Sequence, residues 1–182
     1  MKKIWNFVTT LLVALVVVLA ILLVGVRVVG LNPYVVLSGS MEPTYHVGSL
    51  IYVKKTDPFT IEAQTPITFM MDENTVATHR VVEVVPDAND PTVVRFRTKG
   101  DANDAVDGSL VHYKNVIGVP VFSIPYLGYV SSYITNPPGM YVAFAGLGVI
   151  ILMMFAPDLL KAADAADKKA EEKKKAAESD QT

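Results

Sequence analysis

Two uncharged apolar runs frame the chain, and the segment between them alternates short apolar stretches with polar turns. The first run, Ile4 to Val26, contains no charged residue. At ~1.5 Å per helical residue it reaches about 35 Å, which is enough to cross a hydrocarbon core of ~30 Å. The second run, Met140 to Ala156, is near the lower length limit for a span. The pattern predicts transmembrane helices over residues 4–29 and 139–157, on either side of a domain over residues 31–138.

Each apolar run has an alternative interpretation. Lys2 and Lys3 before an apolar segment also begin a cleaved secretory signal peptide, but the apolar region of such a peptide is ~7–15 residues and this run is longer. For the second run, the alternative is a buried core helix.

Residues 158–182 form a charged low-complexity tail of Ala, Lys, Glu and Asp that cannot build a core. Lysines at both ends favour the cytoplasm, so we expect a two-span cell-membrane protein with cytoplasmic termini and an extracytoplasmic domain.

The segment between the runs has the composition of β-strands. Short stretches rich in β-branched and aromatic residues are separated by turn-forming groups such as residues 72–74 and 86–91. The predicted strands are 50–53, 66–70, 81–85, 93–97 and 116–124. No amphipathic helix of about twelve residues or more is indicated before Gly139. The sequence therefore predicts a mainly β domain with a twisted, partly closed sheet.

Composition narrows the chemistry of this domain. Hydrophobic residues make up 51% of the chain, and their excess is concentrated in the two apolar runs. The net charge of −2 and the absence of a basic aromatic patch argue against nucleic acid as a partner. The chain has no cysteine, which excludes a thiol nucleophile, a thiolate zinc site and disulfides.

A serine nucleophile is the chemistry that the remaining residues favour. Ser40 lies in the string Ser38–Thr44, where Gly39 permits unusual backbone geometry and Pro43 fixes φ. Together they hold the Ser40 hydroxyl outward and leave its backbone N–H free to donate. An ordinary polar turn is the alternative for Ser-Gly-Ser alone, but the longer string is far rarer.

A serine needs a base, and the residues alone leave several candidates open. His46 follows the serine closely on the same turn, His112 fits a strand edge, and His79 begins the strand that continues through Arg80. Lysine bases are also available on paper, although nothing around them argues for burial. These lysines are Lys54, Lys55 and Lys99.

Two carboxylates bracket a turn rich in Asp and Asn. Either Asp101 or Asp107 could orient a histidine as the third group of a triad. The alternative is a calcium site, since alternating Asp and Asn oxygens suit a hard cation. The turn lacks the bidentate Glu of an EF-hand loop, so we expect no metal and no organic cofactor.

Taken together, these strings resemble the motifs of type I signal peptidases, specifically the ER-type (Ser-His) branch of archaea, some Gram-positive bacteria and the endoplasmic reticulum. Ser38–Thr44 resembles the nucleophile box, Thr78–Val82 the base box, and Thr98–Asp101 with Asp107 the acidic box. Val121–Val130 is similar to the segment before the second span. The boxes follow the family's order.

The resemblance covers roughly residues 5–155 and implies roles for single residues. Ser40 corresponds to the nucleophile, and His79 stands where the ordinary bacterial branch has a lysine base. Asp101 and Asp107 both correspond to acids of the ER-type branch, and which one contacts His79 stays open. The Ser40 backbone N–H and the Ser38 side chain correspond to the oxyanion hole.

The implied activity is that of a membrane-bound serine endopeptidase that removes signal peptides from secreted preproteins after small residues, by an acyl-enzyme mechanism. Ser40 lies fourteen residues after Val26, at most ~50 Å of extended chain, so it stays near the bilayer where a signal peptide emerges. The implied partners are signal peptides, the lipid bilayer and the secretion machinery. The alternatives are a non-catalytic tethered β-domain for binding or surface assembly, and a peptidase dedicated to a narrow substrate set such as one pilin or matrix protein.

Overall fold

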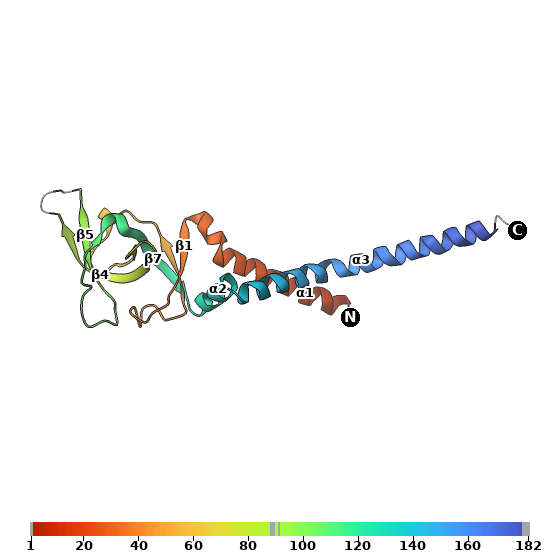
Figure 1. Cartoon of the computed structure of the whole chain (residues 1–182), viewed down its shortest axis with the longest axis horizontal. Helices are drawn as coiled ribbons and strands as arrows, with labels where there is room; N and C mark the ends of the chain where they lie inside the picture. The colour runs from red at the N-terminus through yellow and green to blue at the C-terminus, as the bar shows by residue number, and fades with distance from the viewer. Residues whose placement is uncertain (1, 88–89, 91, 180–182) are drawn as a thin grey trace. The chain divides into compact units, whose positions relative to one another are not determined.

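The chain divides into a helical unit and a β unit (Figure 1). The computed structural model describes residues 2–87, 90 and 92–179. The predicted turn at residues 86–91 and the end of the 158–182 tail lie partly outside these residues. The helical unit comprises Met1–Val18 and Pro138–Thr182, and the β unit comprises Leu19–Pro137.

The β unit is built on one sheet, which has seven strands within the described residues. The strands are β1 (Leu31–Val35), β2 (Leu50–Lys54), β3 (Pro66–Met70), β4 (Val76–Pro86), β5 (Val94–Lys99), β6 (Val111–His112) and β7 (Val116–Ile124). Their order is β1-β2-β7-β3-β4-β5-β6, and every neighbouring pair is antiparallel. Since β1 and β6 end the order without pairing to each other, the sheet is a half-barrel (Figure 1). The prediction of a mainly β domain is confirmed.

The observed strands differ from the sequence prediction chiefly at β4 and β1; in addition, β5 spans Val94–Lys99 rather than residues 93–97, and β6 was not predicted. β4 begins at Val76 rather than at residue 81, so His79 lies inside the strand and not at its start. The reason is pairing: residues 76–80 are matched to β3, with His79 opposite Ile67. The strand β1 was not predicted because Pro33 interrupts it, and proline is tolerated there since β1 is an edge strand.

Two apolar clusters hold the β unit together. The larger lies against β3, β4 and β5 and consists of Ile61, Ile67, Phe69, Val81, Val94, Phe96 and Val111. The smaller joins β2 to the end of the first helix, where Leu50 and Tyr52 pack against Leu22 and its neighbours. The Tyr52 hydroxyl donates to the Leu22 carbonyl at 3.0 Å, and its ring stacks on Phe122. The last turns of this helix are therefore attached to the sheet.

Four helical segments complete the described chain: α1 (Lys2–Leu23), the 3₁₀ helix η1 (Gly25–Val29), α2 (Leu127–Thr135) and α3 (Gly139–Ser179), besides two 3₁₀ turns at Pro58–Thr60 and Tyr113–Asn115. Lys3–Leu23 and Gly139–Lys169 are long and apolar enough to cross a membrane, by length and composition alone. A signal sequence or a core helix also meets that test, but only 6% of the most apolar window of the second is buried. α3 runs through Pro157 to Ser179, past the predicted boundary at residue 157, because the Ala, Lys and Glu that follow favour helix.

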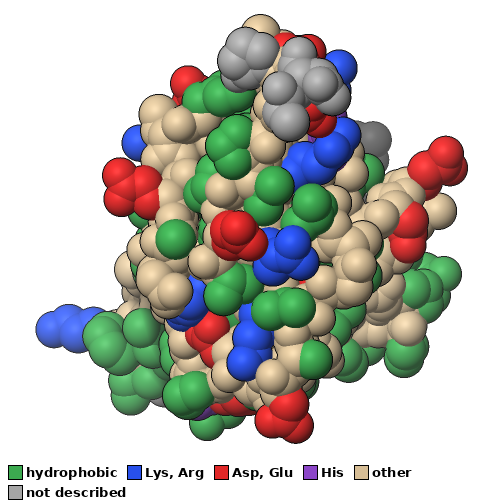
Figure 2. Space-filling model, turned by 90° about the vertical axis from the view of Figure 1, so that its left-hand side faces the viewer, with side chains coloured by type: hydrophobic (Ala, Val, Ile, Leu, Met, Phe, Trp, Pro, Cys, Tyr) green, Lys and Arg blue, Asp and Glu red, His purple; other side chains and the backbone are tan. Residues whose placement is uncertain are grey.

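On the face shown in Figure 2, Lys and Arg side chains stand among Asp and Glu and do not form a patch of one sign. Arg97 of β5 pairs with Glu83 of β4 at 3.0 Å. Such exposed pairs contribute little to stability, so the apolar clusters carry the fold.

The strands β2 and β7 approach closely at an irregularity in their register. The register shifts between Tyr52 and Val53, and Gly118 of β7 lies against the backbone of Lys54. A Cβ added at Gly118 would stand 2.1 Å from the Lys54 carbonyl oxygen. Because the obstacle is backbone, an added methyl group forces the two strands apart.

Gly118→Ala should therefore lower the free energy of unfolding by about 1–3 kcal/mol, the usual cost of forced overpacking. The measurement is thermal or denaturant unfolding of the full chain in detergent. Gly108→Ala is the matched control, because a Cβ there meets no atom within 4 Å. Equal stability of the two variants would contradict the close approach of β2 and β7.

Candidate active site

Ser40 lies in the loop between β1 and β2, and backbone hydrogen bonds between the two ends of this loop close it. The Val36 N–H donates to the Ser49 carbonyl at 2.9 Å, and the Gly48 N–H returns a bond to the Val36 carbonyl at 2.9 Å. Met41, next to the serine, is buried and anchors the loop. A closed and anchored loop holds the Ser40 hydroxyl in one place.

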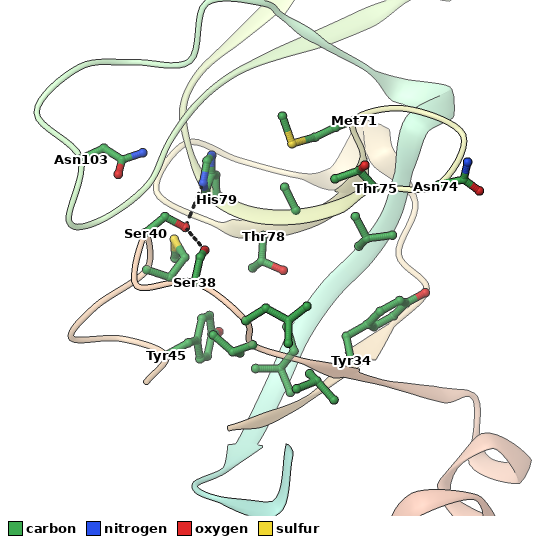
Figure 3. A pocket seen from close by; sticks show the side chains of 17 residues that line it. Tyr34, Ser38, Ser40, Tyr45, Met71, Asn74, Thr75, Thr78, His79 and Asn103 are labelled. Carbon is green, nitrogen blue, oxygen red and sulfur yellow. Dashed lines mark hydrogen bonds between the residues drawn. The ribbon is translucent and has the colours of Figure 1, made fainter. Parts of the chain in front are cut away.

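Three side chains from separate segments form a chain of hydrogen bonds at this loop. The Ser40 Oγ lies 3.2 Å from His79 Nε2 on β4, as Figure 3 shows, and His79 Nδ1 lies 2.7 Å from Asp107 Oδ2 in the loop after β5. Thr98 of β5 donates to the same Asp107 oxygen at 2.6 Å. This is the arrangement of a hydroxyl nucleophile, a base and an orienting carboxylate.

The partners of His79 decide which ring nitrogen carries the proton. An ionised carboxylate only accepts, so the Nδ1–H donates to Asp107 and Nε2 is left to accept from the Ser40 hydroxyl. Phe69 stands edge-on to the imidazole with ring centroids 6.2 Å apart. The His79 side chain is only 13% exposed, so its orientation is fixed on several sides.

The other acid, Asp101, contacts a different residue. Arg80 donates to its two carboxylate oxygens at 2.8 and 2.7 Å, and Thr44 donates at 2.5 Å. The hydrogen bonds from Arg80, and less strongly that from Thr44, hold the pKa of Asp101 below its ordinary value against the opposing effect of burial. The sequence left open which of the two carboxylates contacts His79. In the structure, Asp107 contacts His79 and Asp101 contacts Arg80.

The Arg80–Asp101 pair ties the serine loop to β4. Thr44 belongs to that loop, and Arg80 directly follows His79. In addition, the Ala102 N–H donates to the Ser40 carbonyl at 2.9 Å. Gly100 permits this approach, because a Cβ there would stand 2.6 Å from the same carbonyl oxygen. The loop after β5 (residues 100–110), called the acid loop below, therefore fixes the backbone of Ser40 as well as the imidazole of His79.

Ser38 lies beside Ser40. Its hydroxyl is 3.3 Å from the Ser40 Oγ, and both side chains face the same cleft (Figure 3). Within the described residues, the backbone N–H of Ser40 makes no hydrogen bond. Two donors, one from the backbone and one from a side chain, are thus available near the Ser40 oxygen.

The cleft has a volume of about 570 Å³ and lies between two strand edges. One wall is β1 with the residues that follow it, and β1 pairs only with β2. The other wall is Val76–His79 of β4, which pairs with β3 on one side, while β5 is matched only from Arg80 onward. Apolar and aromatic side chains line the cleft, among them Val36, Ile51 and Ala77. Tyr34, Tyr45 and Met71 also belong to this lining (Figure 3).

The other candidate bases lie elsewhere. His46 pairs with Glu42 on the exposed side of the serine loop. His112 accepts from the Lys114 N–H at 3.2 Å and caps a short 3₁₀ turn. In the described part of the chain, none of the candidate lysines lines the cleft. The same part holds no group of three or more His, Cys, Asp or Glu side chains suited to a metal.

Sequence reasoning assigned no role to three residues that the structure brings to the site. Thr98 carried a usable signal, because it lies on the same face of β5 as the buried Val94 and Phe96, and a polar residue on a buried face needs a partner. Arg80 and Thr44 carried none, since their common partner Asp101 is distant in the sequence.

Comparison with known proteins supports one family. The family model described as "Signal peptidase, peptidase S26" matches residues 5–126. Signal peptidase I W of Bacillus subtilis (strain 168) is 40% identical over 124 residues, which are 64% of this chain and 64% of that protein. The signal peptidase complex catalytic subunit SEC11C of Homo sapiens is 31% identical over 128 residues, 65% of this chain and 66% of that protein.

A third relative, the signal peptidase complex catalytic subunit sec11 of Pyrenophora tritici-repentis, is 31% identical over 141 residues, 71% of this chain and 80% of that protein. The chain thus spans slightly less than two thirds of the length of the first two relatives. The resemblance drawn from the sequence motifs, to the ER-type branch of type I signal peptidases, is confirmed by these matches.

Asp101→Asn should lower the free energy of unfolding by about 1–3 kcal/mol at neutral pH, because Arg80 loses a charged hydrogen-bond partner. The pKa of Asp101 is lowered by folding, so the stabilisation is present above the ordinary carboxyl pKa of ~3.9 and is lost as pH falls through the lowered value. The difference in unfolding midpoint between wild type and Asp101→Asn should therefore be largest at pH 7 and become smaller below about pH 4.

Unfolding midpoints measured across this pH range check the prediction. The exposed Asp104 lies in the same turn, and Asp104→Asn serves as the control, with a small and nearly constant effect. A difference for Asp101→Asn that persists undiminished in acid would contradict the role of its charge.

Proposed function

We propose that this chain, which belongs to the signal peptidase family, peptidase S26, is a membrane-bound serine endopeptidase that removes signal peptides from secreted preproteins after small residues. The observation that carries the proposal is the contact of 3.2 Å between Ser40 Oγ and His79 Nε2, with His79 held by Asp107 at 2.7 Å. A binding module has no need of this alignment at the floor of a cleft.

In the first half of the proposed reaction, the Ser40 oxygen attacks the carbonyl of the scissile peptide bond while His79 Nε2 takes the hydroxyl proton. Asp107 stabilises the imidazolium that forms. The Ser40 N–H and the Ser38 hydroxyl donate to the oxygen that becomes negative. When the C–N bond breaks, His79 returns the proton to the leaving amine, and the signal peptide stays on Ser40 as an ester.

In the second half, a water molecule attacks this ester. His79 takes one proton from the water and gives it to the Ser40 oxygen as the acyl bond breaks, which releases the signal peptide with a free carboxylate. No metal or organic cofactor takes part in either half of the proposed mechanism.

The cleft suits an extended peptide. The free edges of β1 and of Val76–His79 present backbone N–H and C=O groups on both walls, so a bound segment gains hydrogen bonds as an added strand. The apolar lining next to Ser40 includes Met41 and Tyr45 and favours small apolar side chains over charged ones. This geometry supports cleavage after a small residue.

The proposed placement in the membrane follows from the apolar helices. Residues 4–29 and 139–157 are the proposed spans, 31–138 the extracytoplasmic domain and 158–182 a cytoplasmic tail, with both termini in the cytoplasm. The bond from Tyr52 to the Leu22 carbonyl ties the end of the first span to the sheet, which supports a catalytic loop near the bilayer. Some relatives are named as subunits of a complex, so contact with further secretion components is part of the proposal.

Replacement of the two central residues tests the proposal directly. Ser40→Ala and His79→Ala should each abolish cleavage of a preprotein in liposomes while leaving the unfolding midpoint within a few degrees of wild type, because neither residue belongs to the apolar clusters. Mass determination of the product of the wild type should place the cut after a small residue. His46→Ala and His112→Ala are matched controls and should retain cleavage.

Two results would contradict the assignment. Cleavage retained by His79→Ala but lost on replacing a lysine would exclude His79 as the base. A folded wild type that cleaves no preprotein, with or without further membrane components, would favour the non-catalytic tethered domain.

Ser38→Ala should lower kcat by ~10²–10³ with little change in KM, because a donor to the developing oxyanion acts in the transition state. The contact that motivates this is the 3.3 Å distance between the two serine hydroxyls. Steady-state kinetics on a signal-peptide substrate measure it, and Ser38→Thr, which keeps a hydroxyl, is the control. A change confined to KM would assign Ser38 to ground-state binding.

A further inference from the structure

Among the polar side chains of the cleft that have no part in the mechanism above, Asn103 lies across the Ser40–His79 contact from Asn74 and Thr75 (Figure 3). Asn103 belongs to the acid loop between Asp101 and Asp107, and it lines the same cleft as Ser40 and His79. Figure 3 shows it on one side of the Ser40–His79 contact, with Tyr34, Asn74 and Thr75 on the other.

The backbone around Asn103 is held in place. Its N–H donates to the Gly100 carbonyl at 3.0 Å, and the N–H of the preceding Ala102 donates to the Ser40 carbonyl at 2.9 Å. A Cβ added at Gly100 would stand 2.7 Å from the Asn103 amide nitrogen and 2.6 Å from the Ser40 oxygen, so the amide and the serine carbonyl flank the same glycine. The position of the amide is thus tied to that of the nucleophile.

Within the described part of the protein, the amide itself is unused. Across residues 2–87, 90 and 92–179, no hydrogen bond involves the Asn103 side chain, although the residue is partly buried. An amide offers two donors and an acceptor, which complement the C=O and N–H of a peptide group. A group of this kind recognises the main chain of a peptide and not its side chains.

The direction in which a substrate lies in the cleft determines which part of it would meet the Asn103 amide. On the proposed function, the strand edges of the cleft bind the residues before the scissile bond, which are the ones that specify cleavage. The residues after the scissile bond then leave past Ser40 on the side of Asn103. We infer that Asn103 binds the main chain of this leaving segment and orients the scissile bond for attack.

This role has a kinetic consequence. The leaving segment is present only until the C–N bond breaks, so Asn103 assists formation of the acyl-enzyme and has no part in its hydrolysis. The effect of its removal depends on whether the substrate has residues after the scissile bond. A purely structural role in the acid loop would affect all substrates alike.

The test compares two substrates with the same segment before the scissile bond. One is a peptide that continues for about five residues after the bond, and the other is a methyl ester that ends there, with methanol as its leaving group. The full-length chain is assayed in detergent as wild type, Asn103→Ala and Asn103→Leu. Asn74→Ala is the matched control, since Asn74 lines the opposite end of the same cleft.

Asn103→Ala should lower kcat/KM for the extended peptide about tenfold and leave the methyl ester within about twofold of wild type. Asn103→Leu retains the bulk but not the polar atoms and should behave as the alanine variant. Asn74→Ala should not change the ratio of the two substrates.

An equal loss on both substrates would overturn the inference in favour of a structural role, as would no loss on either, or full activity of Asn103→Leu. These results leave the proposed function intact, because the wild type cleaves. A wild type that cleaves neither substrate, with or without further membrane components, would instead refute the proposed function and the inference with it.

Discussion

The site depends on a change of partner along β4. Residues 76–80 of this strand are matched to β3, and from Arg80 to Pro86 the strand is also matched to β5. His79 is therefore the last residue before the second edge of β4 becomes occupied. Its side chain stands at the end of an open strand edge and beside the loop that follows β5. Under the proposed function, the same register thus supplies a wall for a peptide, a base at the end of that wall and an acid that contacts the base.

The two acids of the loop after β5 divide two tasks that a single carboxylate could not perform. Asp107 accepts from His79 and from Thr98, so it contacts the imidazole and is itself held by β5. Asp101 is compensated by Arg80 and linked to the serine loop through Thr44. If Asp101 lacked Arg80, its charge would add to that of Asp107 near one histidine. Because the Arg80 guanidinium pairs with Asp101, it compensates the charge of that carboxylate. His79 is then contacted by the carboxylate of Asp107 and not by that of Asp101.

How far sequence reasoning reached depends on whether a feature is local. The apolar runs and the β-rich middle are local and predicted the fold class, and the strings around Ser40 and His79 indicated these two residues through their resemblance to the signal peptidase motifs. The choice between Asp101 and Asp107 is not local, because the path of the intervening turn decides which carboxylate faces β4. The early start of β4 at Val76 depends on pairing with β3. The position of Asn103 depends on its packing near Gly100 and Ser40. The spacing of apolar and polar residues along the sequence predicts neither feature.

On the proposed function, both sides of the cleft recognise a peptide by the same means. The edges of β1 and β4 bind main-chain groups before the scissile bond, and the inferred role of Asn103 is to bind main-chain groups after it. Main-chain recognition is indifferent to side chains, so discrimination is left to the apolar lining next to Ser40. An enzyme that must accept many mature proteins after the cut, but only small residues before it, requires this division. Contacts placed on the main chain and a restrictive lining at one position achieve it without a specific contact for each substrate.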